Sequence, residues 1–313
     1  MSAPFISVAL ATYNGERYLR EQLDSVLAQT GVAIEIVAVD DGSKDGTLAI
    51  LNDYARRDAR VKVYANPRNL GVGPTFEHAM SLTTGELIAP CDQDDMWHSD
   101  KLARLAAAIG ECDLAYCDSL FVNADGTTMN ERISDRMPMM HGCHPMAFTL
   151  RNSVSGHASL IRRGLFEIAR PFPAAMYYDW WLALCAATRN GIVFVDAPLV
   201  HFRRHAATVS PLGRAGKQRV RDRATRWVRD RQAFLTAYAQ SGVAGHDEAA
   251  RMLAALDTAW EGRSASALLG EIWRQRKSLA DASPATEAIR LQFRFLRKIR
   301  QARREAEDAV VAT

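Results

Sequence analysis

Three carboxylates stand close together in the run Asp92-Gln93-Asp94-Asp95. Unpaired like charges repel one another at this spacing, and a hard divalent cation removes that cost. Mg²⁺ and Mn²⁺ prefer oxygen ligands, and Mg²⁺ typically takes one or two protein carboxylates together with substrate phosphates. The run therefore indicates a metal and phosphate site. A solvated acidic turn that caps the following helix is the alternative, and the run alone does not decide between them.

Short apolar runs of β-rich composition alternate with segments of helical spacing over residues 5–117. The predicted strands are Phe5–Ala11, Ile34–Val39, Val61–Ala65, Glu86–Pro90 and Asp113–Cys117. Repeated strand–helix–strand units predict an α/β fold, with a mostly parallel sheet and helices on both of its faces. The acidic run follows the fourth of these strands.

Two further strands also end in polar residues. Thr12-Tyr13-Asn14 follows the first strand, and Asp40-Asp41 follows the second. Ligands of such sheets bind at the carboxyl ends of the strands, so these clusters and the acidic run are predicted to form one site.

Local signals place helices between the predicted strands. Asn14 and Ser99 are predicted to cap the helices that follow them, because short polar side chains accept hydrogen bonds from the first turn of a helix. Helical spacing also predicts a helix over Thr75–Leu82. By contrast, Arg136–Met146 has no clear period and is predicted to be a loop.

Four motifs occur in a distinctive order and spacing. They are VALATYNGERYLREQLDSVLAQT, IEIVAVDDGSKDGT, NPRNLGVGPTFEHA and GELIAPCDQDDMWHSDKL. Together they resemble the family 2 glycosyltransferases of the GT-A fold, a Rossmann-like fold, over roughly residues 5–210. Each motif is weak alone, and the four in order are specific.

The resemblance implies where a nucleotide would bind. In such enzymes the first strand end and the VDDGS acid hold the base, which places Thr12, Tyr13 and Asp41 in that role, with Asn14 and Asp40 beside them. A carboxylate can accept from the imide N–H of uracil or thymine, and an aromatic ring can pack on the base. The alternatives are core packing for Tyr13 and an ordinary turn for the acidic pair.

The acidic run matches the Asp-x-Asp motif of the family. The resemblance puts Asp92 near the ribose and the metal, and Asp94 in direct contact with Mg²⁺ or Mn²⁺. Asp95 is expected to be a supporting acid at the diphosphate or a helix cap. Trp97 is expected either in the core or on a wall of the sugar pocket.

Glycosyl transfer needs a base for the acceptor hydroxyl, and one positioned carboxylate suffices. The family has an acidic pair at the position of Tyr178-Asp179, so only Asp179 can fill the role here. Its aromatic surroundings would exclude water and raise its pKa. The alternative is an N-cap on a buried aromatic helix.

Two further segments resemble parts of the donor and acceptor pocket. Gly156 lies between small polar residues, where its backbone can approach a ligand closely, and His157 follows it as a sugar contact or a structural histidine. In Leu199–Ser210, the residues Arg203, Arg204 and His205 resemble a segment that closes over the diphosphate. Arginine suits phosphate, and histidine can add a metal ligand. A basic surface loop is the alternative.

The motifs are most similar to those of bacterial enzymes that transfer L-rhamnose from dTDP-L-rhamnose. An inverting, metal-dependent transfer to a cell-surface glycan or lipid-linked acceptor is therefore expected. Three alternatives remain: a transferase using another UDP- or dTDP-sugar such as galactose or N-acetylglucosamine, a nucleotidyltransferase, and a non-catalytic sugar-nucleotide-binding or scaffold protein. A nucleotidyltransferase would need a glycine-rich phosphate loop where this chain has Thr12-Tyr13-Asn14.

Composition and charge divide the chain near residue 210. Residues 1–210 are predicted to form the catalytic domain, with the nucleotide sugar bound in 1–117 and the acceptor in 118–210. Residues 211–313 hold 20 Lys and Arg against 12 Asp and Glu and are predicted to be helical. Scattered cysteines, the lack of a signal peptide and the lack of an 18-residue apolar run point to the cytoplasm.

The basic C-terminal region has two possible explanations. Ile289–Arg304 interleaves apolar residues with Arg and Lys, a pattern that can lie on an anionic membrane surface at the inner face of the membrane. Alternatively, its apolar stripe packs against the rest of the protein. No nucleic-acid-binding motif accompanies the charge, so nucleic acid is not an expected partner.

Overall fold

The computed structural model describes residues 3–149, 151–174, 176–205, 223–275, 293 and 296–305. The chain divides into two compact units. The sheet unit comprises Met1–Met139 and Ser153–Ala215, and the helical unit comprises Met140–Asn152 and Gly216–Thr313. The segment Met140–Asn152, which lies inside the predicted acceptor half, thus groups with the C-terminal residues. The functional division of the chain stays a prediction.

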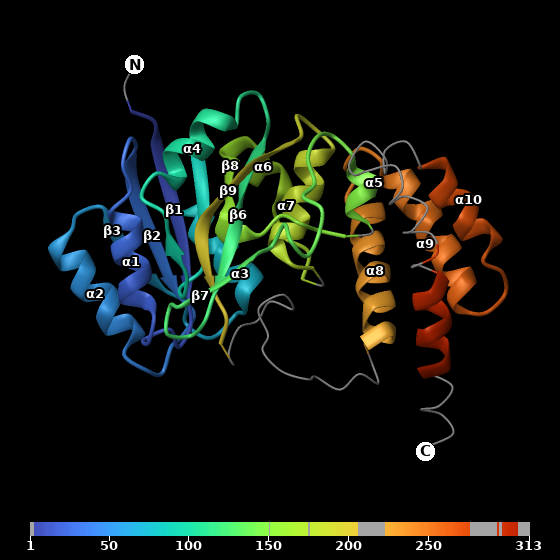
Figure 1. The fold of residues 1–313 in the computed structure, drawn as a ribbon, viewed down its shortest axis with the longest axis horizontal. Coiled ribbons are helices and arrows are strands. Elements are labelled where there is room, and N and C mark those ends of the chain that lie inside the picture. The colour runs from blue at the N-terminus through green and yellow to red at the C-terminus, as the bar shows by residue number, and fades with distance from the viewer. Residues whose placement is uncertain are drawn as a thin grey trace. The chain divides into compact units, whose positions relative to one another are not determined.

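A nine-stranded sheet forms the centre of the sheet unit, in the order β3-β2-β1-β4-β8-β6-β9-β5 with β7 paired to β6 (Figure 1). The strands are β1 Phe5–Thr12, β2 Ala33–Asp40, β3 Val61–Ala65, β4 Leu87–Cys91, β5 Met96–Trp97, β6 Leu114–Val122, β7 Thr128–Arg132, β8 Ser159–Arg162 and β9 Ile192–Arg203. Strands β3, β2, β1 and β4 run parallel, as do β6 and β9, whereas β8, β7 and β5 pair antiparallel to their neighbours. The predicted α/β fold with a mostly parallel sheet is confirmed.

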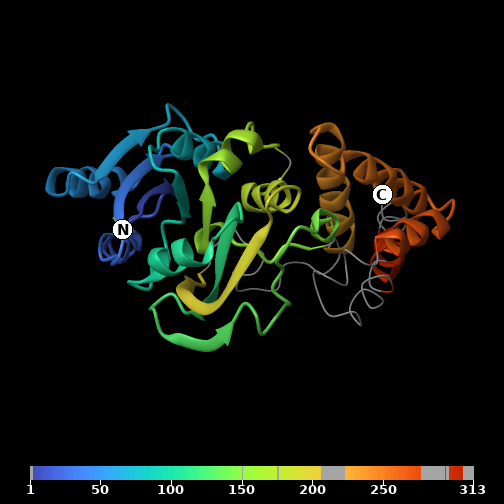
Figure 2. The same cartoon turned by 90° about the horizontal axis from the view of Figure 1, so that it is seen from above.

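Helices cover both faces of this sheet (Figure 2). On one face lie α1 (Leu19–Leu27), α2 (Thr47–Arg57) and α4 (Lys101–Ala108), whose apolar residues form one core with alternate residues of β1 and β2. On the other lie α3 (Val72–Ser81), α6 (Arg163–Ala169) and α7 (Tyr178–Ala187). Side chains alternate across a strand, so both faces of the central strands are apolar and the polar groups collect at the strand ends.

Two predicted helix caps are not formed. The residue before α1 is Tyr18, whereas Asn14 has left-handed backbone (φ 49°) and its Oδ1 accepts a hydrogen bond from Lys44 N at 2.8 Å. The residue before α4 is Asp100, one position after Ser99. Both polar residues lie in turns that precede the helix. The predictions missed the caps because sequence signals locate the start of a helix only to within a few residues.

The 12-residue strand β9 has no counterpart among the predicted strands. Its pairing with β6 is irregular: Cys117 lies opposite Val195, Asp118 opposite Pro198 and Ser119 opposite Val200. Three residues of β9 are thus extra over this stretch, and a bulge of this kind breaks the period-two pattern by which strands are recognised. Beyond the bulge, β9 ends at Arg203, whose backbone N–H donates to Asp95 Oδ1 in the acidic run.

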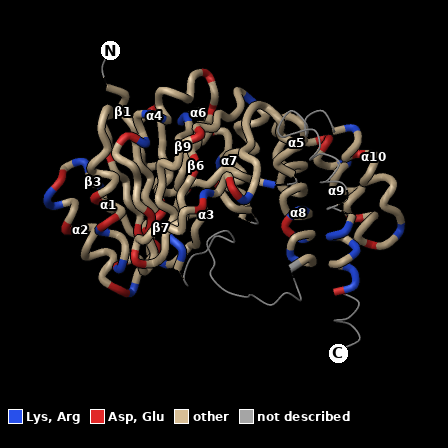
Figure 3. Tube along the Cα trace, viewed as in Figure 1, with Lys and Arg blue, Asp and Glu red and all other residues tan. Residues whose placement is uncertain are grey.

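The described part of the helical unit contains α5 (Pro145–Phe148), α8 (Arg223–Gln240), α9 (His246–Trp260) and α10 (Ser266–Arg274). α5 begins inside the run predicted to be a loop. Residues 296–305 are also helical. Figure 3 shows Lys and Arg on the described C-terminal helices, interspersed with Asp and Glu.

The C-terminal apolar stripe is partly described. Ile299 and Ala302 are buried, and the Ala302 carbonyl accepts from the Thr225 hydroxyl of α8 at 3.3 Å, whereas Phe293 is exposed. This end of the stripe therefore packs inside the helical unit. The remaining stripe residues, 289–292, 294 and 295, lie outside the described residues. None of the described helices combines the length and apolar character needed to cross a bilayer.

Candidate active site

The ends of β1 and β2 are joined by buried hydrogen bonds. Thr12 Oγ1 donates to Asp40 Oδ1 at 3.1 Å, and Asp40 also accepts from the Ser43 hydroxyl and backbone N–H at 2.5 and 2.9 Å. Because these strands are parallel neighbours, Thr12 and Asp40 lie side by side. Asp40 therefore shapes the turn after β2, and its nucleotide contact stays a prediction.

Asp41 organises a different loop. Its carboxylate accepts from Asn66 Nδ2 at 2.8 Å and from the backbone N–H groups of Leu70 and Gly71 at 2.8 and 2.9 Å. The side chain is buried. A carboxylate offers about four lone-pair positions, so Asp41 retains capacity for one further donor. The predicted contact with an imide N–H therefore stays a prediction.

Tyr13 is 45% exposed, which rules out simple core packing. The side-chain amide of Gln93 holds its backbone in place, because Gln93 Oε1 accepts from Tyr13 N at 2.8 Å and Gln93 Nε2 donates to Tyr13 O at 3.0 Å. Gly15 makes room for this amide: a Cβ there would lie 2.2 Å from Gln93 Oε1. The ring of Tyr13 is thus presented to solvent by a fixed backbone.

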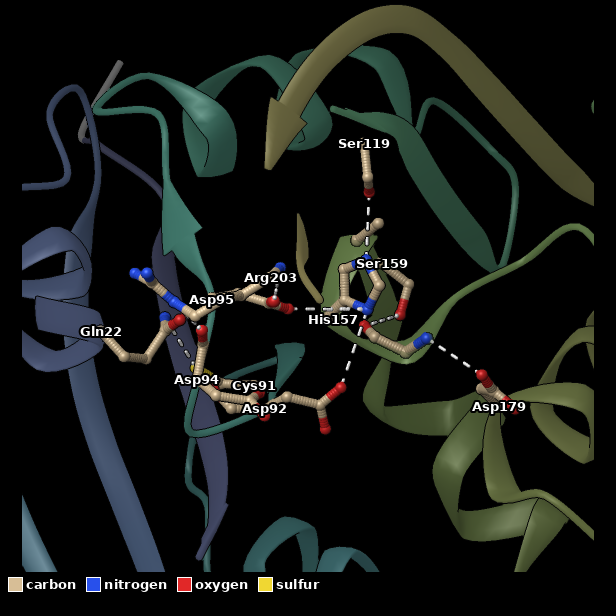
Figure 4. Close-up of polar contacts among 12 residues, drawn as sticks. Gln22, Cys91, Asp92, Asp94, Asp95, Ser119, His157, Ser159, Asp179 and Arg203 are labelled. Carbon is tan, nitrogen blue, oxygen red and sulfur yellow. Dashed lines mark hydrogen bonds and ion pairs between the residues drawn. The ribbon is translucent and has the colours of Figure 1, made fainter. Parts of the chain in front are cut away.

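The acidic run divides into two groups after β4. In the first, His157 Nδ1 lies 3.7 Å from both Asp92 Oδ2 and Asp95 Oδ2 (Figure 4). Its other nitrogen, Nε2, lies 3.0 Å from the Ser119 hydroxyl. The ligand atoms of Asp92, Asp95 and His157 all lie within 4.8 Å of one another. Among the described residues these three side chains form a possible metal-binding group.

Charges inside this first group depend on one another. Burial raises the pKa of Asp95 to about 7, with His157 opposing the shift and the neighbouring Asp94 and Asp92 adding to it. Burial lowers the pKa of His157, but the carboxylates of Asp95 and Asp92 outweigh that effect, so the net shift is upward. One oxygen of Asp95, Oδ2, is buried without a hydrogen-bond partner. That oxygen faces the imidazole and calls for a proton or a cation.

The second group pairs Asp94 with His205. His205 Nε2 lies 2.7 Å from Asp94 Oδ2, although the residues are 111 positions apart. The side chains of His205 and Asp94 are 13% and 19% exposed, whereas those of His157 and Asp95 are 5% and 0% exposed. The structure therefore separates the predicted ligands: Asp94 pairs with His205, whereas Asp92, which is 39% exposed, lies beside the buried Asp95 and His157.

Arg203 takes a structural position beside the acidic run. Its backbone N–H donates to Asp95 Oδ1 at 3.0 Å, its Nε donates to Asp94 O at 2.9 Å, and its Nη1 donates to Ala124 O at 3.0 Å. Its Nη2 pairs with Glu21. The buried guanidinium is thus hydrogen-bonded to protein groups, and its expected contact with the diphosphate stays a prediction. Arg204 lies over the ring of Phe121, 5.6 Å from its centroid.

Trp97 belongs to the hydrophobic core. It is buried, and the ammonium of Lys101 lies 3.1 Å from the centroid of its ring. Of the two settings expected for Trp97, the structure shows core packing and not a pocket wall. The reason is local: β5 turns Trp97 inward against α1 and β9.

Asp179 lies in the first turn of α7, whose N-cap is Tyr177, so it is not the cap. Its Oδ2 accepts from Gly156 N at 3.2 Å and its Oδ1 from Trp180 N at 2.7 Å. Burial raises the pKa of Asp179 to about 6, although both backbone donors oppose the shift. A carboxyl with this pKa is ionised at neutral pH and can take a proton, as a general base requires.

Gly156 is required by its neighbour Tyr178. A Cβ at Gly156 would lie 1.9 Å from the Tyr178 hydroxyl, so the close approach is to a protein ring and not to open space. Gly156 begins the three-residue 3-10 turn η1 (Gly156–Ala158), which also carries His157. One short turn therefore links the acidic strand end to Asp179, as Figure 4 shows.

A family model described as glycosyl transferase family 2 matches residues 7–168, about half of the chain. The chain belongs to glycosyl transferase family 2. The matched residues include the three polar strand ends and His157, whereas Asp179, Arg203 and His205 lie beyond them. Most of the matched residues lie in the sheet unit, and residues 140–152 of the match belong to the helical unit.

Similar proteins agree with this assignment. EpsH of Bacillus subtilis (strain 168), named as a glycosyltransferase, is 30% identical over 219 residues, which cover 67% of this chain and 63% of EpsH. TuaG of the same organism, named for teichuronic acid biosynthesis, is 32% identical over 132 residues, covering 42% of this chain and 52% of TuaG. The chain thus spans less than two thirds of the length of these curated relatives.

Solved structures share the fold. The crystal structure of S. aureus TarS residues 1–349 with UDP-GlcNAc has a TM-score of 0.59 and 17% identity, covering 99% of this chain and 92% of that one. The mannosyltransferase PcManGT of Pyrobaculum calidifontis, in complex with GDP-Man and Mn²⁺, has a TM-score of 0.54 and 17% identity, covering 96% and 86%. At such identities the likeness shows the GT-A fold, which confirms that prediction.

Gln93, Ser119 and Lys101 are site residues that the sequence reasoning does not find. Gln93 has a signal in the sequence, because it lies inside the acidic run. Ser119 and Lys101 have no such signal. A serine in a strand and a lysine at the start of a helix are usually surface residues, and nothing in the sequence sets these two apart. Only the fold brings both to His157.

Proposed function

We propose that this family 2 protein is an inverting, metal-dependent glycosyltransferase that moves a sugar from a nucleoside diphosphate to an acceptor hydroxyl. One observation carries the proposal: η1 links Asp179 to the acidic strand end, through Gly156 N and the His157 side chain. The η1 turn holds the base on one side and the acidic diphosphate site on the other. This arrangement suits a direct displacement, in which the acceptor oxygen replaces the diphosphate at the anomeric carbon. No protein nucleophile is needed in that reaction.

The donor set fits a hard divalent cation. Carboxylate oxygens and imidazole nitrogens are ligands that Mn²⁺ accepts, and Mg²⁺ accepts the oxygens. The unpartnered Oδ2 of Asp95 shows that this strand end has more negative charge than protein donors satisfy. We assign the ion to Asp94 and His205 with Asp92, because these side chains are the more accessible ones. Bound there, a cation would neutralise the diphosphate leaving group.

The residues of the chain divide the remaining work. Asp95 and His157 form a buried support beside Asp92. The exposed ring of Tyr13 offers a flat apolar surface for a base, next to Thr12 and Asp40. Asp179 takes the proton of the acceptor hydroxyl while that oxygen attacks the anomeric carbon from the face opposite the leaving group, which inverts the configuration.

The donor sugar and the acceptor are the finer parts of the proposal. The motif resemblance favours L-rhamnose from dTDP-L-rhamnose, and the relative TuaG is named for teichuronic acid biosynthesis. We therefore propose a cell-surface glycan or lipid-linked acceptor, reached at the inner face of the membrane.

A thermal-shift screen tests this function. UDP, dTDP, GDP, dTDP-L-rhamnose, UDP-galactose and UDP-N-acetylglucosamine are each added with Mn²⁺, with Mg²⁺ and with chelator. Ligand at 100 times its Kd stabilises the folded state by about 2.7 kcal/mol, so the ranking reports the base and the sugar. Metal-dependent stabilisation and slow donor hydrolysis are expected. The absence of any nucleotide effect with either metal would contradict the proposal.

A further inference from the structure

Lys101 is a buried cation directly behind the site. It is the first residue of α4, its side chain is 0% exposed, and its Nζ donates to the His157 carbonyl at 2.5 Å. The same ammonium lies over the Trp97 ring. Among the described residues, Lys101 has no carboxylate within salt-bridge distance.

A buried ammonium without a carboxylate partner is not expected where a side chain serves stability alone. Burial lowers the pKa of Lys101 to about 8, with the thiols of Cys117 and Cys91 and then Asp95 and Asp92 acting in the opposite direction. Removing an ammonium from water is costly, and apolar residues of similar shape often replace buried charges without loss of stability. The sequence nevertheless places a lysine among Trp97 and the buried thiols.

The contact made by Lys101 completes the anchoring of η1. Each of the three carbonyls in this turn accepts from a side chain: Gly156 O from Ser159 Oγ at 2.8 Å, His157 O from Lys101 Nζ, and Ala158 O from Cys117 Sγ at 3.4 Å. Of these donors only Lys101 is charged, and charge-assisted hydrogen bonds are roughly twice as strong as neutral ones. The middle of the turn is therefore its most firmly held point.

The turn faces the reaction on its other side. Its Gly156 N–H holds Asp179, and its His157 ring lies between Asp92 and Asp95 (Figure 4). A shift of the turn would move the base and the acidic strand end relative to each other. Misplacement of reacting groups by about 1 Å can cost 10²-fold in rate.

We propose that Lys101 is a positioning residue for glycosyl transfer, which fixes the η1 turn so that Asp179 and the acidic strand end keep their relative placement. The inference rests on the proposed function for its kinetic consequence. Its structural part, the anchoring of η1 by a buried ammonium, is independent of that function.

The test compares Lys101→Met with Leu105→Ala. Methionine nearly preserves the shape of lysine but removes the charge and the donor, and Leu105 is a core residue one turn further along α4 that contacts the core cluster. Two readouts are taken for each variant and the wild type: hydrogen exchange of peptides covering residues 153–161, and the kcat and KM of Mn²⁺-dependent hydrolysis of the best sugar nucleotide in the screen.

Lys101→Met is expected to keep or raise the melting temperature, to speed exchange in residues 153–161, and to lower kcat by roughly 10- to 100-fold with little change in donor KM. Leu105→Ala is expected to lower the melting temperature while leaving kcat at 25 °C nearly unchanged. Unaltered exchange and kcat in Lys101→Met would overturn the proposal. So would failure of this variant to fold, because the charge would then be a requirement of folding.

The two hypotheses fail separately. If the wild type hydrolyses no sugar nucleotide, the proposed function is wrong, and hydrogen exchange alone still decides whether Lys101 anchors η1. If the wild type is active and Lys101→Met matches it in exchange and kcat, the function stands and the role of Lys101 is rejected.

Discussion

His205 Nε2 lies 2.7 Å from Asp94 Oδ2, although His205 follows the end of β9 and Asp94 follows β4, 111 positions earlier in the sequence. An imidazole held on a carboxylate in a partly exposed setting is the arrangement from which a metal could take both groups.

The first prediction concerns this pair. Asp94→Ala and His205→Ala should each abolish the Mn²⁺-dependent part of nucleotide stabilisation and lower transfer at least 10²-fold, because the diphosphate loses its counter-charge. Calorimetric titration of UDP and dTDP with and without Mn²⁺ measures it.

His157→Ala serves as the contrasting variant for the metal. If it removes Mn²⁺-dependent binding while His205→Ala retains it, the ion is held by Asp92, Asp95 and His157, and our assignment to Asp94 and His205 is wrong. Equal nucleotide affinity with chelator and with Mn²⁺ in the wild type would reject a metal altogether.

The second prediction concerns the base. Asp179→Asn is nearly isosteric, so nucleotide affinity should be preserved while turnover falls by roughly 10²–10⁴, the usual contribution of a positioned general base. Asp196→Asn is the matched control, because Asp196 is an exposed carboxylate on β9. Lost donor affinity with retained turnover would make Asp179 a binding residue instead.

The third prediction follows from the pKa of Asp179, raised to about 6 by burial. A base acts only when deprotonated, so kcat should fall as pH drops below about 6, and this acidic limb should be absent from the residual activity of Asp179→Asn. A kcat profile from pH 4.5 to 8 measures it. A flat profile across pH 5–7 in the wild type would contradict the assignment.

Stability has the opposite dependence on pH at this residue. The folded state holds the Asp179 proton up to about pH 6, whereas the unfolded chain releases it near the ordinary value of 3.8, so this group lowers stability as pH rises between the two. Asp179→Asn should therefore be more stable than the wild type above pH 6, and the difference should vanish near pH 4. Urea unfolding at both pH values checks the sign.

The fourth prediction concerns Arg203. Arg203→Ala removes the guanidinium contacts to Asp94 O, Ala124 O and Glu21, and it should reduce the free energy of unfolding by about 1–3 kcal/mol, because two backbone carbonyls lose their hydrogen-bond donor. Glu21→Gln, at the exposed end of the pair, should cost far less. Direct diphosphate binding by Arg203 would instead appear as lost nucleotide affinity at unchanged stability.

The fifth prediction concerns the basic C-terminal region. Replacing Arg297, Lys298 and Arg300 with Gln, together with Arg294 outside the described residues, should weaken sedimentation with anionic vesicles at low salt, since each cation near such a surface contributes about 1 kcal/mol. Stability should be unchanged, because Ile299 and Ala302 carry the packing. Absence of vesicle binding by the wild type at low salt would leave this helix as structural packing.

The sequence predicts those parts of the sheet unit in which apolar runs and polar strand ends give local signals. β1, β2, β3 and β4 and the polar residues after them are predicted within one or two residues, because a buried strand followed by a turn is legible in a short window. The acidic run stands out by residue type alone, whereas Asp179 is identified through the resemblance to the family.

The rest depended on contacts between distant segments. Whether Asp94 or Asp95 is accessible, and which histidine joins which acid, is decided by β9 and η1, whose residues lie more than 60 positions from the run. Arg203 illustrates the limit: its type suits phosphate, but the bulged β9 directs it to the backbone of Asp94. Lys101 is indistinguishable in sequence from a surface lysine.

The bulge in β9 also restricts how this chain can change in length. Residues 196–199 hold the extra positions, and deletion of any one of them would rotate every side chain from Val200 to Arg203 to the opposite face of the strand. Relatives with the same chemistry should therefore share the length of β9, and an insertion or deletion between residues 196 and 199 would indicate a disrupted active site.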